Sequence, residues 1–381
     1  MSENVKRILL LSTAYLPAIG GSELALKNLT ERLGEYEFDL ITGHTVPGTP
    51  VKEQQGNLTI YRVGGFFACH GLIIPKIFLP FSIVRKARQL LRVRSYSLMH
   101  AYQASQAAGA GWLLKHLYPS LPFLLTIQEG KNLSEQPWII RALRNMIFTN
   151  VNRATAISTY LQKYAQSVRA DMPVDWIPNG VDFSVFVRRD ASLIRRHLGI
   201  PDQHAVLVSI SRLVEKNGIE FLIRALPKVH GINPSSLVLV GDGPLRKHLE
   251  TVAMDAHVDH IVHWIPRCLP EEVPLYLSLA DVFIRPSISE GFGTAFIEAM
   301  ALEVPVVGTS VGGIKDFLVH ERTGLICKTK NPDDIAQQII RILRDDHLRA
   351  HIIEQSKMMV HERYSWDHSA EQMRSVYQQF A

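Results

Sequence analysis

Residues 282–300 read VFIRPSISEGFGTAFIEAM, and this order predicts an apolar strand, a glycine loop and the start of a helix. Gly291 and Gly293 let the backbone come close to a ligand. The free amides at the N-terminus of the following helix suit a phosphate group. Glu290 would stand before the helix and Glu298 about one turn inside it, so the two carboxylates would reach different parts of one elongated ligand. Taken alone, the same residues also fit a helix with an acidic first turn and a solvated glutamate.

Two further elements have the same order of strand, loop and helix. Arg212 and Lys216 follow the apolar run Ala205 to Ser211, and ligands of parallel sheets bind at that edge. An arginine fork and a lysine point charge can neutralise a diphosphate, although surface cations are usually just solvated. In the first half, Gly20 and Gly21 follow the first strand and open a helix. Two glycines of a tight turn are an equal alternative there.

Apolar runs of strand length recur along the whole chain. They are continuous rather than alternating, which indicates parallel sheets covered on both faces. The pattern restarts after the turn-rich residues 178–182 (PNGVD), and the last residues, Ser365 to Phe380, have the spacing of an amphipathic helix. We therefore predict an α/β protein with two doubly wound domains, residues 1–182 and 183–362, followed by a terminal helix over 363–381.

Length and composition agree with this organisation. A chain of 381 residues exceeds the size of one hydrophobic core, and 46% hydrophobic with 20% charged residues is typical of globular proteins. The three cysteines are far apart and form no CxxC pair, so neither a disulfide framework nor a cysteine zinc site is indicated. The first residues show neither a signal-peptide cleavage site nor a membrane span, and we expect a cytoplasmic location.

Charge is distributed unevenly in the first half. Between Glu53 and Glu129 there is no acidic residue, and the segment Phe66 to Arg94 combines apolar residues with clustered cations. This segment fits a docking surface for anionic membrane, on the inner face, as well as it fits a core helix with a solvated basic face. No nucleic-acid-reading module accompanies the cations, so nucleic acid is not expected as a partner. His347 and His351, four residues apart, lack the ligands of a zinc signature.

Several motifs follow one another along the chain. They are Gly20-Gly21, Pro178-Asn-Gly-Val-Asp182, Arg212 with Lys216, Val240-Gly-Asp-Gly-Pro244, Glu290-Gly-Phe-Gly with Glu298, and Gly312-Gly313. Together they resemble the retaining family 4 glycosyltransferases of GT-B fold, over nearly the whole chain. The resemblance implies two Rossmann-like domains facing a central cleft, a terminal helix that packs back on the first domain, and a nucleotide-sugar donor held mainly by the second domain.

The resemblance also implies residue roles. Arg212 and Lys216 look like the pair that binds the donor diphosphate, and Glu290 looks like the glutamate that meets the donor sugar hydroxyls. Backbone contacts to sugar and phosphate would come from Gly291, Phe292, Gly293 and Thr294, ribose contacts from Glu298, and contacts to phosphate and acceptor from Gly20 and Gly21. Many relatives carry a histidine where this chain has Gln128, which can hydrogen-bond a sugar hydroxyl but exchanges no proton at neutral pH.

The resemblance, taken together with these residues, implies a retaining hexosyltransferase that would use a UDP- or GDP-sugar and a glycan or lipid-linked acceptor. No Asp-x-Asp triplet occurs in the sequence, and two cations with a helix N-terminus can stabilise the leaving diphosphate, so we expect neither a metal nor another cofactor. Two alternatives remain open. One is a nucleotide-sugar epimerase or hydrolase of the same fold. The other is a non-catalytic nucleotide-sugar-binding subunit, which Gln128 leaves open.

Overall fold

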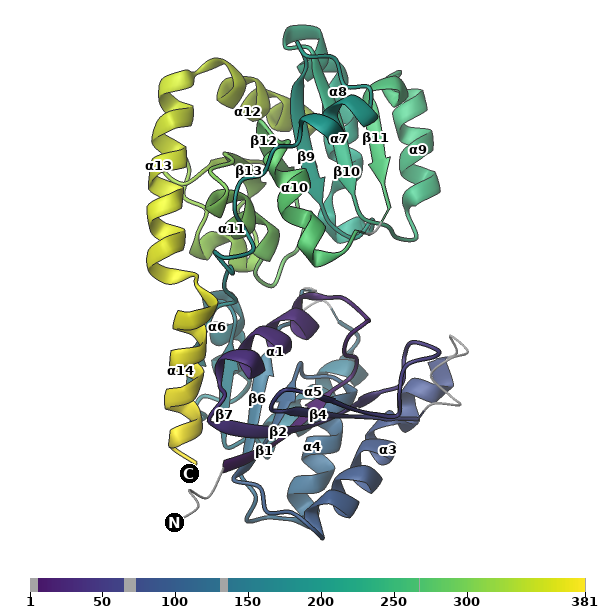
Figure 1. Cartoon of the computed structure of the whole chain (residues 1–381), viewed down its shortest axis with the longest axis vertical. Helices are drawn as coiled ribbons and strands as arrows, with labels where there is room; N and C mark the ends of the chain where they lie inside the picture. The colour runs from purple at the N-terminus through teal and green to yellow at the C-terminus, as the bar shows by residue number, and fades with distance from the viewer. Residues whose placement is uncertain (1–5, 65–72, 131–135, 267, 381) are drawn as a thin grey trace. The chain divides into compact units, whose positions relative to one another are not determined.

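The computed structural model of the chain describes residues 6–64, 73–130, 136–266 and 268–380. It separates into two compact units, Met1–Asn179 with Trp366–Ala381, and Gly180–Ser365 (Figure 1). The sequence analysis set the boundaries after residues 182 and 362 instead. The N–H of Val181 donates to the carbonyl oxygen of Tyr364 at 2.7 Å, and Val181 forms a parallel bridge with Ser365. These contacts keep both flanking segments with the second unit.

The first unit is built on an eight-stranded sheet of order β3-β4-β2-β1-β5-β6-β7-β8, parallel except for the antiparallel pair β3 and β4. Its elements are β1 (Lys6–Ser12), α1 (Gly21–Arg32), β2 (Tyr36–Gly43), β3 (Lys52–Gln55), β4 (Leu58–Val63), α3 (Ile73–Leu91), β5 (Leu98–Tyr102), α4 (Gln106–Leu117), β6 (Phe123–Ile127), α5 (Trp138–Thr149), β7 (Arg153–Ala156), α6 (Thr159–Val168) and β8 (Val174–Trp176).

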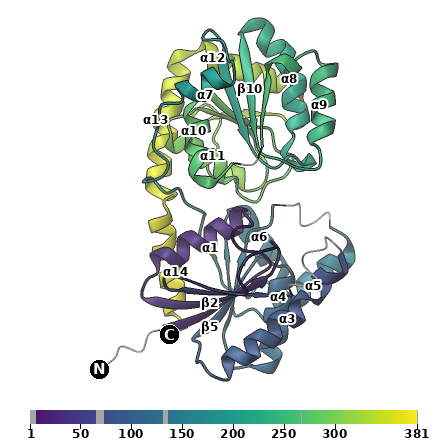
Figure 2. The ribbon, with the colours of Figure 1, turned by 45° about the vertical axis from the view of Figure 1, so that its right-hand side comes forward.

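The terminal helix α14 (Trp366–Gln378) completes the core of the first unit. Its apolar face, which includes Trp366, Met373 and Tyr377, is buried with residues of α1, β1 and β2. The helix itself lies beside α1 (Figure 2). The hydroxyl of Tyr377 lies 2.8 Å from Nδ1 of the buried His100 on β5. The predicted packing of an amphipathic C-terminal helix against the first domain is present, and the helix begins at Trp366 rather than 363.

The second unit contains a fully parallel six-stranded sheet of order β11-β10-β9-β12-β13-β14. Its strands and α-helices are α7 (Ser192–His197), β9 (Ala205–Ile210), α8 (Ile219–Ile232), β10 (Ser235–Val240), α9 (Arg246–Asp255), β11 (Val262–Ile265), α10 (Val273–Ser278), β12 (Val282–Arg285), α11 (Thr294–Ala301), β13 (Val306–Thr309), β14 (Leu325–Cys327), α12 (Pro332–Arg344) and α13 (Asp346–Arg363). Strands β10, β12 and β13 are buried throughout and β9 is buried except at its two ends, as their continuous apolar runs predicted.

The strand order of each sheet fixes where a ligand can bind. In the second unit the order reverses between β9 and β12, because β10 and β11 follow on one side and β13 and β14 on the other. In open parallel sheets, ligands bind outside the carboxyl ends of the strands at this reversal. In the first unit the corresponding reversal lies between β1 and β5. We therefore expect a ligand at the loops after β9 and β12 in the second unit and at those after β1 and β5 in the first.

Candidate functional site

The loop after β9 presents Arg212 at the reversal point of the second sheet. Its backbone is fixed, since the N–H of Leu213 donates to the carbonyl oxygen of Asp242 at 3.0 Å and Nδ2 of the buried Asn217 donates to the carbonyl oxygen of Arg212 at 2.6 Å. The Arg212 side chain is exposed, and within the described part of the chain its guanidinium has neither a hydrogen bond nor an ion pair. Arg212 is thus a cation on a fixed backbone whose charge is available to a ligand.

Lys216 lies in the short 3-10 helix η1 (Glu215–Asn217) and is tied to the segment after β12. Its carbonyl oxygen accepts the N–H groups of Ile288 at 2.7 Å and Ser289 at 3.3 Å. Gly218, at φ 67°, ends η1, and a Cβ there would lie 2.1 Å from the carbonyl oxygen of Pro286. Only glycine allows these two loops to approach so closely. The approach brings Lys216 to the corner that contains Glu290.

Glu290 is the centre of the site. Its Oε1 lies 3.4 Å from Nζ of Lys216 and accepts the N–H of Gly291 at 3.1 Å, and its Oε2 lies 3.0 Å from Nη2 of Arg285. The side chain is 12% exposed. Its backbone carbonyl accepts the N–H of Gly313 at 3.2 Å. The structure therefore places Glu290 in a largely enclosed ion-pair network, and the alternative of a solvated glutamate is wrong.

Burial and neighbouring charges act in opposite directions on these groups. Burial raises the pKa of Glu290, but the cations Arg285 and Lys216 and the Gly291 amide outweigh burial and hold that pKa below its ordinary value. Burial lowers the pKa of Lys216, and the positive charges of Arg285 and Arg212 act in the same direction while Glu290 opposes them. Glu290 is therefore an ionised carboxylate at neutral pH, and its two oxygens have different cationic partners.

The loop after Glu290 leads into α11 as the sequence predicted. Gly293, at φ 102°, is the N-cap residue and Thr294 is the first residue of the helix. Phe292 is 2% exposed and its ring packs against Phe317 and Tyr364, so the loop is anchored in the core and only its backbone is available to a ligand. Glu298 lies one turn inside α11, and burial raises its pKa to about 7 against the opposing charge of Arg285.

The first unit places the remaining predicted residues at the carboxyl edge of its own sheet. Gly20 is the N-cap residue of α1 in extended conformation and Gly21 is its first helical residue. Gln128 directly follows β6 and is 9% exposed. Among the described residues, no hydrogen bond joins Gln128 to either glycine. Gln128 and the two glycines have in common only that they lie at the carboxyl edge of the same sheet. Their roles toward a substrate stay predictions.

Two residues of these edges were missed by sequence reasoning. Arg285 ends β12 and is 6% exposed, and a cation at the end of an otherwise apolar strand (VFIR) is the signal that identifies it. Glu129 follows Gln128, and its Oε1 accepts the N–H of Ala104 at 2.5 Å while its Oε2 is buried without a partner among the described residues. Burial raises the pKa of Glu129. Nothing in the sequence marks Glu129 as enclosed.

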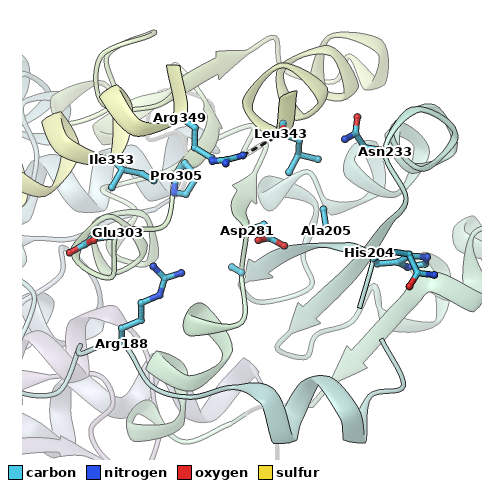
Figure 3. A pocket seen from close by; sticks show the side chains of 12 residues that line it. Arg188, His204, Ala205, Asn233, Asp281, Glu303, Pro305, Leu343, Arg349 and Ile353 are labelled. Atoms are coloured by element: carbon cyan, nitrogen blue, oxygen red, sulfur yellow. Dashed lines mark hydrogen bonds between the residues drawn. The ribbon is translucent and has the colours of Figure 1, made fainter. Parts of the chain in front are cut away.

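An open pocket of about 480 Å³ lies at the opposite edge of the second sheet (Figure 3). Ala205 at the start of β9, Asp281 before β12 and Pro305 before β13 line it. Two of its charged groups have partners of their own: Arg349 pairs with Asp346 at 2.7 Å, and Asp281 accepts the N–H of Val206 at 2.7 Å. The pocket is thus separate from the residues described above.

His347 and His351, whose spacing was noted in the sequence, lie on α13. Over the residues that the structure describes, no group of three or more His, Cys, Asp or Glu side chains is placed to hold a metal ion.

Comparison with known proteins connects this arrangement to a family. Residues 19–185 match the model of Glycosyltransferase Family 4, and residues 190–359 match that of Glycosyl transferases group 1. An uncharacterized glycosyltransferase of Methanocaldococcus jannaschii is 30% identical over 97% of each chain. Among solved structures, sucrose-phosphate synthase from Thermosynechococcus elongatus has a TM-score of 0.88 at 23% identity, with 98% of each chain covered. Anabaena HepE in complex with UDP-glucose has a TM-score of 0.81 at 19% identity, covering 98% of this chain and 99% of that one. The chain therefore belongs to the glycosyltransferases of the group 1 and family 4 type, and its two parallel-sheet α/β units have the GT-B fold.

Proposed function

We propose that this glycosyltransferase moves a hexose from a UDP- or GDP-sugar to a hydroxyl of a glycan or lipid-linked acceptor, with retention of the anomeric configuration and without a metal ion. The observation that carries the proposal is the arrangement of Arg212, Lys216 and Glu290 at the reversal point of the second sheet, beside the N-terminus of α11. A phosphate group suits a helix N-terminus, and the two cations add to its positive potential. The UDP-glucose bound by HepE, a protein of the same fold, supports this choice of donor class.

The proposed chemistry uses these charges at the moment when the donor bond breaks. As the bond between the anomeric carbon and the diphosphate oxygen breaks, negative charge grows on the diphosphate, and Arg212 and Lys216 stabilise it. The acceptor hydroxyl oxygen bonds to the same face of the anomeric carbon, and its proton goes to the departing phosphate oxygen. No protein nucleophile is required by this scheme. Glu290 and the Gly291 to Thr294 backbone would orient the sugar, and Glu298 would bind the ribose hydroxyls.

Donor consumption in the presence and absence of acceptor tests the proposal. UDP-glucose, UDP-N-acetylglucosamine and GDP-mannose are incubated with the full chain and a panel of glycan and lipid acceptors, and free nucleoside diphosphate is measured. We expect release that depends on acceptor, is unchanged by EDTA, and is lost in Arg212→Ala and Glu290→Ala. The variant Arg224→Ala is a matched control, because Arg224 is a half-exposed arginine of α8 that pairs with Glu220 on the same helix.

The same assay distinguishes the two alternatives. Donor turnover that is independent of every acceptor would favour an epimerase or hydrolase of this fold. Tight donor binding in calorimetry with no turnover would favour a nucleotide-sugar-binding subunit. A wild-type transfer rate in Arg212→Ala would contradict the proposed site itself. An α-configured product, determined by NMR from an α-linked donor, is the outcome that retention requires.

We also propose that helices α3 and α5 carry a surface for anionic membrane, as part of a role with a lipid-linked acceptor on the cytoplasmic face of the membrane. Within the described ranges, none of the helices is both long and apolar enough to cross a bilayer. Both helices pack against α4. Large apolar side chains are exposed on α3 (Ile77, Phe78 and Phe81) and on α5 (Trp138, Ile139, Ile140 and Leu143).

Cations flank these apolar side chains. Arg85 and Arg88 on α3 and Arg141 on α5 are exposed. Their positive charge is complementary to the negative charge of anionic lipid headgroups. Part of the predicted Phe66 to Arg94 segment, residues 66–72, lies outside the described residues. In the described part of the segment, Leu79 and Ile83 are buried. The segment therefore contributes some residues to the core and others to the exposed face of α3.

Co-sedimentation with vesicles tests the membrane surface. Phosphatidylcholine vesicles are compared with vesicles that also contain phosphatidylglycerol, for the wild type, Arg85/Lys86/Arg88→Ala and Trp138/Ile139→Ser. We expect pelleting with the anionic vesicles only, reduced in both variants and unchanged in Leu193→Ser, which replaces an equally exposed apolar residue of the second unit. Equal pelleting in all cases contradicts the proposal.

A further inference from the structure

Arg285 is a buried cation that the assigned motifs do not include. It is the last residue of β12, and its side chain is 8% exposed. Its Nη2 lies 3.0 Å from Oε2 of Glu290, its Nη1 lies 3.5 Å from the carbonyl oxygen of Ile210 at the end of β9, and its guanidinium lies 5.0 Å from the ring centroid of Phe296 on α11. Arg285 thus joins β9, α11 and the glutamate loop at the reversal point of the sheet.

The two oxygens of Glu290 are divided between two cations of unequal mobility. Lys216 has a flexible side chain that is 32% exposed, and it reaches Oε1 over 3.4 Å. Arg285 is enclosed, has a planar fork and reaches Oε2 over the shorter distance. A diphosphate beside η1 would compete with Glu290 for Lys216, but it could not displace the enclosed Arg285. One partner of Glu290 is therefore exchangeable and the other is permanent.

We propose that Arg285 is a positioning residue, which holds the Glu290 carboxylate in a fixed orientation so that Lys216 is free to move to the donor phosphate. This inference rests on the proposed function, because it assigns the sugar contact to Glu290 and the phosphate contact to Lys216. Without Arg285, Lys216 would be the remaining cationic partner of Glu290, and donor binding would have to break that pair.

A purely structural role explains Arg285 less well. Burying an ion pair is often neutral or unfavourable compared with apolar packing of the same volume, and the other three residues of β12 are apolar. The cation nevertheless stands where Glu290 and Glu298 both feel its charge. An apolar residue would complete the strand but would leave both carboxylates without that charge.

The charged groups around the carboxylates predict a pH signature. Glu290 faces Arg285 and Lys216, Lys216 also feels Arg212, and Glu298 feels Arg285. Removal of Arg285 takes away a charge that lowers the pKa of both glutamates, so both carboxylates would protonate at higher pH. The acid limb of a pH–rate profile would then move to higher pH. A role in packing alone would not move that limb.

The experiment compares Arg285→Met and Arg285→Lys with the wild type in the full chain. Circular dichroism and urea denaturation establish folding, and donor kcat, KM and the pH–rate profile are measured. In Arg285→Met we expect kcat to fall roughly 100-fold, since a misplaced orienting group costs on that order, and the acid limb to shift upward. Arg285→Lys keeps the charge and loses the fork, so its acid limb should return toward the wild-type pH while kcat stays reduced. Arg246→Met is the control, because Arg246 also combines an aromatic ring, Trp264, with a glutamate, Glu250, and lies on α9.

Binding of UDP gives a readout that does not depend on transfer. Calorimetry should show weaker UDP binding in Arg285→Met, with the loss largest at the pH where Glu290 is ionised and holds Lys216. A folded Arg285→Met protein with wild-type pH profile and wild-type UDP affinity overturns the inference. If the wild type binds UDP but transfers no sugar, the proposed function fails, and the calorimetric comparison still decides the role of Arg285. If Arg285→Met does not fold, Arg285→Lys decides it: reduced kcat with unshifted acid limb supports positioning, and wild-type kcat overturns it.

Discussion

Gly312 lies against the backbone of Glu290, and its replacement by alanine tests the geometry of the site. Gly312 begins the 3-10 helix η4 (Gly312–Asp316) at φ 50°, and a Cβ at this position would lie 1.8 Å from the carbonyl oxygen of Glu290. The neighbouring N–H, that of Gly313, donates to the same carbonyl oxygen at 3.2 Å. Because the obstacle is backbone rather than a flexible side chain, the methyl group can fit only if the Glu290 loop moves.

The cost of Gly312→Ala has two parts. Alanine in the left-handed region costs about 1–2 kcal/mol. Overpacking against a fixed backbone adds about 1–3 kcal/mol. The sum of about 2–5 kcal/mol is a large fraction of the stability of a typical domain. The same shift of Glu290 would lengthen its contacts with Lys216 and Arg285, so transfer activity should fall even at temperatures where the protein remains folded.

Urea denaturation followed by circular dichroism measures the stability, and Gly231→Ala is the matched control. Gly231 lies in the last turn of α8, where a Cβ meets no atom within 4 Å, so alanine there should stabilise by roughly 0.5–1 kcal/mol. The two substitutions add the same methyl group to the same unit and should shift the midpoint in opposite directions. Equal midpoints for wild type and Gly312→Ala, with unchanged donor turnover, would refute the geometry described for Glu290.

Three other predictions concern pH and the terminal helix. Because burial raises the pKa of Glu298 to about 7, UDP affinity should increase as pH rises from about 6 to 8, and calorimetry of Glu298→Gln should show a smaller increase than the wild type. Burial, and then the charge of His230, lowers the pKa of His204, so the contribution of His204 to stability is present above about pH 6.5 and is lost as pH falls. In His204→Asn the urea midpoint should therefore depend less on pH between pH 7.5 and 5.5 than in the wild type. An unchanged dependence of the midpoint on pH would contradict the assignment. Tyr377→Phe leaves the buried Nδ1 of His100 without its partner and should destabilise by about 1–3 kcal/mol, while loss of the exposed ion pairs in Arg374→Ala should cost about 0–1 kcal/mol in the same urea titration.

The central strands could be predicted because each is a continuous apolar run in a buried parallel sheet. The strands that were not predicted include both edges of the first sheet and one edge of the second: β3 is the polar sequence KEQQ, and β8 (VDW) and β14 (LIC) have three residues each. An edge strand gains its hydrogen bonds from one neighbour only, and a short or polar one carries no distinctive periodicity. Its existence depends on the rest of the sheet, which local sequence does not describe.

The site divides in a similar way. Glu290, Gly291, Gly293 and Glu298 are adjacent in sequence, so residue type and spacing were enough to predict a ligand loop and its helix. The partnership of Glu290 with Arg285 and Lys216 was not predictable from spacing, because it depends on the approach of the loops after β9 and β12. The requirement for glycine at Gly312 likewise comes from a contact with a residue that is distant in sequence.

The three cations Arg212, Lys216 and Arg285 therefore differ in their surroundings, although the sequence shows them only as positive charges. Arg285 is enclosed and permanently paired with Glu290, and it contributes orientation rather than ligand contact. Lys216 can pair either with Glu290 or with a ligand phosphate, because the Glu290 carboxylate keeps Arg285 as a partner when Lys216 leaves. Arg212 is exposed on a fixed backbone and lowers the pKa of Lys216 through its charge. An approaching dianion would thus meet Arg212 first and would then draw Lys216 from Glu290. The negative charge of the ligand would relieve the repulsion between these two cations. Under the proposed function, donor binding and the release of Glu290 from Lys216 would then occur in one step.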